Sequence, residues 1–164
     1  MHMHMHMHMH MVPASVVSVV RVAGLADEAP PLCEIVVSGQ ATGQQVPGAV
    51  LEAAAQWQSF TLLFTTDDVP YEEFLHIHLL DAQLNLLDSA TVGGMYSTGS
   101  FSLLESTEPD TLRFRFIGDT DWSVQVLPAP GFRVPLLSEP AGVSRPLGFS
   151  RHFIVRCNPL PDSR

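Results

Sequence analysis

The chain has 164 residues, with 8 basic side chains against 17 acidic ones and a net charge of −9. Only 15% of the residues are charged and 46% are hydrophobic, which excludes a disordered chain. All the basic residues are Arg and they are scattered, so neither nucleic acid nor an anionic membrane surface is expected as a partner. The absence of Lys excludes Schiff-base chemistry and a phosphate-binding P-loop.

Residues 1–10 repeat Met-His five times, which resembles a purification tag. The repeat has the period of a β-strand, so if ordered it would form an added edge strand with Met on one face and His on the other. We therefore predict a tag at 1–10, a single domain at 11–157 and a flexible tail at 158–164, which contains two Pro.

The segment Val12–Ala23 is apolar but lacks the basic start and the cleavage site of a signal peptide, and no apolar run reaches the ~20 residues of a membrane span. Two cysteines, Cys33 and Cys157, are too few for a disulfide scaffold. Two reduced thiols are favoured over a bridge, and a cytoplasmic protein is expected. A secreted protein stays open if a signal peptide has been removed.

Strand patterns dominate the chain, because 13 Pro and 11 Gly interrupt it about every ten residues. In chain order the expected strands are Ser15–Ala23, Leu32–Ser38, Trp57–Thr66, Glu73–Leu80, Leu86–Val92, Ser100–Glu105, Thr111–Ile117, Trp122–Leu127, Phe132–Leu137 and Phe149–Cys157. The best helical candidate, Ala49–Gln56, is short. The pattern predicts an all-β fold, an antiparallel two-sheet sandwich that is jelly-roll-like and has about ten strands.

Two neighbouring strands give the clearest local prediction. Apolar and polar residues alternate through Thr111–Ile117 and again through Trp122–Leu127, as expected for strands with one buried face. The Gly and Asp residues at 118–121 suit a tight turn, so these strands are predicted to form a hairpin. Arg113 and Arg115 share the polar face, where cross-strand ion pairs are favoured over contact with an anionic partner.

The most specific chemical signal is His76-Ile77-His78 within a predicted strand. Both imidazoles would lie on one face, roughly 6.5–7 Å apart, close enough to bind one metal ion. This strand resembles the first metal motif of the cupins, and Pro146–His152 loosely resembles their second. The resemblance implies a divalent metal held by His76, His78, His152 and the acidic Asp81. The alternative is a structural His pair on a wet face, in a pocket or at an interface.

A second set of residues suggests carbohydrate binding. Asp119 and Asp121 lie in a predicted turn and could coordinate Ca²⁺. Trp57 is assigned to the exposed face of its strand, where it could stack on a sugar, and Tyr71 and Tyr96 fall in predicted turns.

Three functions follow from these patterns. The first is a non-enzymatic β-sandwich module that binds a protein partner or self-associates as a homo-oligomer, because a fold with many strand edges invites pairing. The second is a cupin-like metal-dependent enzyme. The third is a calcium-assisted carbohydrate-binding module.

Overall fold

The structure, a computed structural model, describes residues 8–26, 29–69, 73–93, 99–134, 137–146 and 148–158. These residues contain thirteen β-strands and no helix, and every strand pairing among them is antiparallel. The predicted all-β, antiparallel class is confirmed. The strands form three sheets, whereas two were expected. No helix in the described part of the chain is long and apolar enough to cross a membrane.

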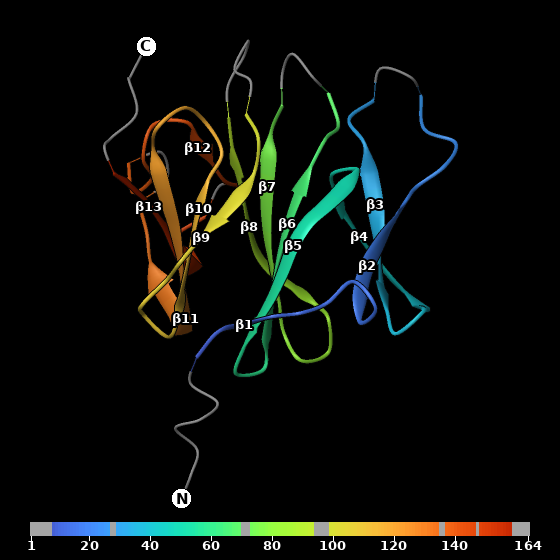
Figure 1. The fold of residues 1–164 in the computed structure, drawn as a ribbon, viewed down its shortest axis with the longest axis horizontal. Coiled ribbons are helices and arrows are strands. Elements are labelled where there is room, and N and C mark those ends of the chain that lie inside the picture. The colour runs from blue at the N-terminus through green and yellow to red at the C-terminus, as the bar shows by residue number, and fades with distance from the viewer. Residues whose placement is uncertain are drawn as a thin grey trace, which may run out of the picture.

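The central sheet has six strands, and four of them follow one another directly along the chain (Figure 1). Its order is β1 (His10–Met11), β5 (Val50–Trp57), β6 (Phe60–Thr66), β7 (Leu75–Leu80), β8 (Leu86–Val92) and β12 (Val143–Ser144). The two strands at its edges, β1 and β12, have two residues each.

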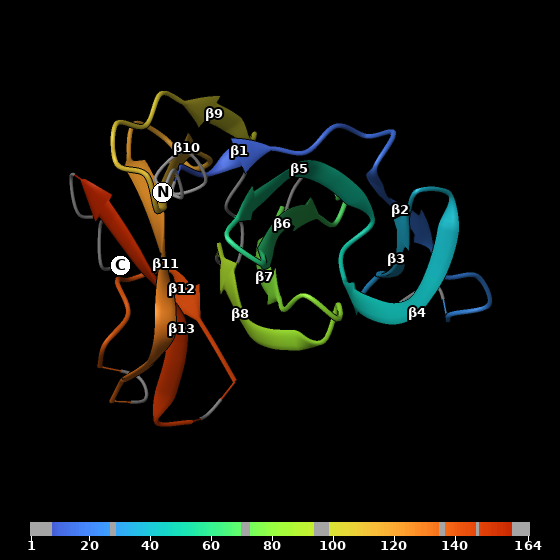
Figure 2. The ribbon, with the colours of Figure 1, turned by 90° about the horizontal axis from the view of Figure 1, so that it is seen from below.

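Two smaller sheets lie on either side of the central sheet (Figures 1 and 2). The C-terminal sheet has the order β13 (Ser150–Asn158), β11 (Asp121–Phe132), β10 (Thr111–Arg115) and β9 (Ser102–Leu104). The N-terminal sheet has the order β2 (Val17–Arg21), β3 (Leu32–Val37) and β4 (Gln40–Pro47).

The central sheet is buried on both faces. Its Leu62, Phe64 and Ile77 pack against the C-terminal sheet in the larger of two hydrophobic cores. Its Leu63 and Leu80 point the other way and pack against the N-terminal sheet in the smaller core. Because both faces are covered, nearly every residue of β6 and β7 is buried, including polar ones such as Thr65 and His78.

The predicted hairpin is confirmed. In β10 and β11, Leu112 pairs with Val124 and Phe114 with Trp122, and all four side chains lie in the larger core. The turn expected at 118–121 joins the two strands and ends where β11 begins at Asp121. The alternating pattern was informative here because the C-terminal sheet has only one buried face.

Two sequence expectations are wrong, and one strand was missed. The helical candidate Ala49–Gln56 lies almost entirely in β5, where small Ala side chains are buried between the two outer sheets. The polar segment Gln40–Pro47 is strand β4, which had not been predicted, because most of its side chains stay exposed or half-buried. Phe132 ends β11 and does not begin a new strand at 132–137, where residues 135 and 136 lie outside the described ranges.

The two cysteines belong to different sheets. Cys33 is fully buried in β3 of the N-terminal sheet, and Cys157 is half-buried in β13 of the C-terminal sheet. Both thiols are free, as favoured from the sequence.

Candidate functional site

The two histidines of β7 share one face of the central sheet, as predicted. Ile77 between them lies in the larger core, while His76 and His78 point toward the N-terminal sheet. Their rings stack with 6.1 Å between centroids and 14° between planes. The pair therefore lies in the layer between two sheets and not on a wet surface.

Both ring nitrogens of His76 are engaged. Its Nε2 lies 2.7 Å from Oδ1 of Asp67, and its Nδ1 lies 3.1 Å from Oγ1 of Thr91. The side chains of His76 and Asp67 are each 12% exposed. At this distance the contact with the carboxylate is an ion pair when the imidazole carries a proton. Asp67, directly after β6, and Thr91 on β8 were not predicted as partners, because strand pairing alone brings them to β7.

His78 is a buried, neutral histidine. Only 1% of it is exposed, and its Nε2 lies 3.1 Å from both the Pro47 carbonyl oxygen and Thr65 Oγ1. Because the carbonyl can only accept, the proton belongs on Nε2, which leaves the buried Nδ1 without a hydrogen-bond partner among the described residues. Burial, assisted by the charge of His76, lowers the pKa of His78 to about 4.

Gly48 allows this arrangement to form. It follows Pro47 where the chain passes from the N-terminal to the central sheet, and its φ is 127°. A Cβ atom at Gly48 would lie 2.4 Å from Thr65 Oγ1. The close approach lets Thr65 donate to the Pro47 carbonyl oxygen at 2.8 Å, beside the imidazole of His78.

The other two metal ligands implied by the cupin resemblance lie elsewhere. His152 is on β13, in the sheet that covers the opposite face of the central sheet, and its backbone N–H donates to Asp88. Asp81 accepts the backbone N–H groups of Gln83 and Asn85 at 2.9 Å each, and the second of these bonds is the main cause of its lowered pKa. Among the residues that the structure describes, no group of three or more His, Cys, Asp or Glu side chains could hold a metal ion.

Of the residues considered for carbohydrate binding, Trp57 was wrongly expected to be exposed. It is 5% exposed, lies in the larger core and stacks on Phe60 with 6.3 Å between ring centroids. The error has a simple cause. The alternation had been continued through the turn at Gln58 and Ser59, whereas Trp57 and Phe60 face each other across that turn. Paired residues lie on the same face of a sheet.

The carboxylate of Asp121 is held by arginines. It lies 2.7 Å from Nε of Arg115 and 3.0 Å from a terminal nitrogen of Arg113, which agrees with the predicted cross-strand ion pairs. The hydrogen bond from Arg115 is the main cause of the lowered pKa of Asp121. Asp119 is exposed in the preceding turn. Tyr71 and Tyr96 lie outside the described residues.

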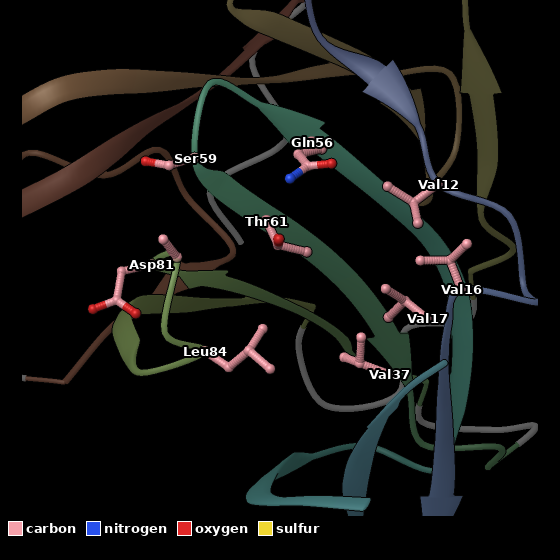
Figure 3. Close-up of a pocket in the computed structure, with 10 residues that line it drawn as sticks. Val12, Val16, Val17, Val37, Gln56, Ser59, Thr61, Asp81 and Leu84 are labelled. Carbon is pink, nitrogen blue, oxygen red and sulfur yellow. The ribbon is translucent and has the colours of Figure 1, made fainter. Parts of the chain in front are cut away.

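A pocket of about 350 Å³ opens between the N-terminal sheet and one end of the central sheet (Figure 3). Its lining comprises Val12, Val16, Val17, Val37, Gln56, Ser59, Thr61, Asp81, Ala82 and Leu84. The valines gather at one end of the pocket, and Ser59 and Asp81 lie at the other (Figure 3). The lining therefore combines apolar side chains with groups that can form hydrogen bonds.

A buried cluster of charges joins the other side of the central sheet to β13. The side chain of Arg145 is 0% exposed and lies 2.7 Å from Asp88 Oδ2 and 2.9 Å from Glu139 Oε2. The contact with Glu139 has ion-pair distance but not the geometry of a hydrogen bond. Arg145 also donates to the Phe153 carbonyl oxygen at 2.7 Å and lies over the Phe153 ring. These contacts give the cluster a structural role, because they connect β8 to β13.

The sequence contained no local signal for this cluster or for the pocket, since each is assembled from segments far apart in the chain. No family model, curated protein or solved structure matches the chain.

Proposed function

We propose that the chain is a non-enzymatic binding module whose pocket between the N-terminal and central sheets receives an apolar group of a protein partner. The observation that carries the proposal is the pocket itself, with the valines at one end and Ser59 and Asp81 at the other. A volume of about 350 Å³ is within the range of small-ligand pockets, which are mostly apolar with a few polar groups that fix orientation.

The chemistry of the lining indicates what the pocket would bind. Burial of apolar surface against the valines contributes roughly 25 cal/mol for each Å² removed from water. Gln56, Ser59 and Thr61 can exchange hydrogen bonds with a polar group attached to the apolar one. The carboxylate of Asp81 and the net charge of −9 favour a partner that carries positive charge.

The proposal includes a fold in which the central and C-terminal sheets form a β-sandwich. The shared core between the two sheets supports this assignment. The jelly-roll part of the expectation has no such support, because β5, β6, β7 and β8 are neighbours in the order in which they occur along the chain.

Filling the pocket tests the proposal. Val16 lines the pocket and is 41% exposed, so Val16→Trp should occupy it without disturbing a core. Val20, on the adjoining strand β2, is 59% exposed and does not line the pocket, so Val20→Trp is a matched control. We expect Val16→Trp to weaken binding of the neutral dye Nile red at least about tenfold, and Val20→Trp to leave it unchanged. Equal binding by both variants would remove the pocket as the site.

Self-association is the alternative in which the partner is a second copy of the chain. Sedimentation velocity across a hundredfold range of protein concentration, at constant salt, distinguishes the two. A sedimentation coefficient that rises with concentration supports the second copy, whereas a constant monomer value leaves a different protein as the partner.

A further inference from the structure

The outer edge of β5 is covered by the very short strand β1, which lies at the end of the Met-His repeat that resembles a purification tag (Figure 2). In β1, His10 pairs with Gln56 and Met11 with Ala55. Just beyond it, the backbone N–H of Val12 donates to the Ala54 carbonyl oxygen at 2.8 Å. The next residue is Pro13, and the paired segment ends before it.

The side chains of this segment pack against both hydrophobic cores, one on each face of the central sheet. Met9 packs against the larger core, and its backbone N–H donates at 2.6 Å to the Pro109 carbonyl oxygen, in the loop before β10. Val12 points to the other face, where it lines the proposed binding pocket. Met11 shares the face of Met9 but remains 43% exposed. The β5 edge thus offers backbone pairing plus two side-chain sites, the combination by which sheets bind extended peptides.

The residue pattern of the segment that occupies this edge does not define a single register along β5. Its Met-His repeat has a period of two residues, so a shift of two residues along β5 returns Met and His to the same faces. The β5 edge can therefore pair with this alternating pattern in more than one register. A two-residue strand also contributes few hydrogen bonds, which makes it replaceable.

The surroundings of the edge are acidic. Pro109 lies between Glu108 and Asp110, and Asp81 lines the adjoining pocket. We infer that the outer edge of β5 is a strand-addition site, at which an extended partner segment with alternating apolar and basic residues replaces Met9–Val12. This inference rests on the proposed binding function and specifies the class of partner.

The first experiment displaces the resident strand in the full chain. Met9→Asp places a carboxylate against the larger core, which disfavours the docked segment. Met11→Asp adds the same charge at a half-exposed position and is the matched control. The probe is a fluorescein-labelled peptide, acetyl-Met-His-Met-His-Met-Val-amide, followed by fluorescence anisotropy. We expect Met9→Asp to bind it at least about tenfold more tightly than the unaltered chain, and Met11→Asp to stay within about twofold.

Val12→Pro offers a second way to open the edge if Met9→Asp does not fold, because it removes the N–H that donates to Ala54 without adding charge. It should also raise affinity for the probe. If neither opened variant binds the peptide better than the unaltered chain, the β5 edge is not a strand-addition site.

Methylation of the peptide backbone separates strand addition from side-chain docking. An N-methyl group on the terminal Val of the probe, in the position of Val12, should abolish binding to the opened chain. An N-methyl group on the preceding Met should be tolerated, because that N–H points away from β5. Equal effects of the two methyl groups would overturn the inference.

The charge requirement and the pocket are tested separately. Replacing the two His of the probe by Glu should weaken binding at least about fivefold if the acidic rim selects basic residues. If Nile red binds Val16→Trp and Val20→Trp with equal affinity, the pocket is not the binding site. If the two methylated peptides bind the opened chain with equal affinity, strand addition is overturned.

Discussion

The buried His78 should make the stability of the protein depend on pH below neutrality. Its pKa is lowered from an ordinary value near 6.5 to about 4, so the unfolded chain takes up this proton at a higher pH than the folded chain does. The contribution of the neutral His78 to the free energy of unfolding is fully present above about pH 7. It decreases as the pH falls through 6.5 and is completely lost below pH 4. At about 1.36 kcal/mol for each pKa unit, the loss is about 2 kcal/mol at pH 5 and about 3 kcal/mol below pH 4.

Urea unfolding at pH 7.5, 6 and 5 measures this loss directly. His78→Gln keeps an amide that can donate to the Pro47 carbonyl oxygen and has no imidazole to titrate. We expect the variant to lose about 2 kcal/mol less than the unaltered chain between pH 7.5 and 5. His152→Gln, on the opposite side of the central sheet, leaves the His78 contribution intact. A loss in His78→Gln as large as in the unaltered chain would refute the reasoning.

Three other substitutions or reactions test the packing. Arg145→Leu leaves two buried carboxylates without their cation and should lower the free energy of unfolding by about 3–5 kcal/mol in thermal or urea unfolding; a change below about 1 kcal/mol would contradict the structural role of the cluster. Gly48→Ala should destabilise the chain more than Gly118→Ala, which should cost about 1 kcal/mol, because a Cβ is blocked by Thr65 only at Gly48. The Cys33 thiol is fully buried, and this burial is the main cause that raises its pKa to about 11. It should therefore react with Ellman's reagent at pH 8 only when the chain unfolds. Rapid labelling of Cys33 in the folded protein would be inconsistent with its buried position.

The sequence predicted best where a strand has one buried and one exposed face. The β10–β11 hairpin has that character, and its inward side chains and the cross-strand ion pairing of its arginines were predicted from alternation, although Asp121 was not predicted as their partner. The strand expected at Leu86–Val92 has the same bounds in the structure. In the hairpin, the local pattern contains the information that decides which face is buried.

Prediction failed where tertiary contacts determine the secondary structure of a segment or bring distant side chains together. The Ala-rich β5 resembles a short helix in isolation, and only its position between two outer sheets makes it a strand. The His76–His78 pair was recognised, but whether His152 joins it depends on which sheet covers which face, and strand order cannot be read from a single pattern. The Arg145 cluster combines charges from residues 88, 139 and 145, whose proximity has no local signature.

In the described part of the chain, β6 and β7 supply side chains to both hydrophobic cores, so the two cores share the central sheet as their boundary. Unfolding of either outer sheet would expose one apolar face of the central sheet to water, so neither outer sheet can unfold alone without a large free-energy cost. Calorimetry should show a single cooperative transition. A molecule bound beside the N-terminal sheet would then raise the melting temperature of the C-terminal sheet as well, although it touches no residue there.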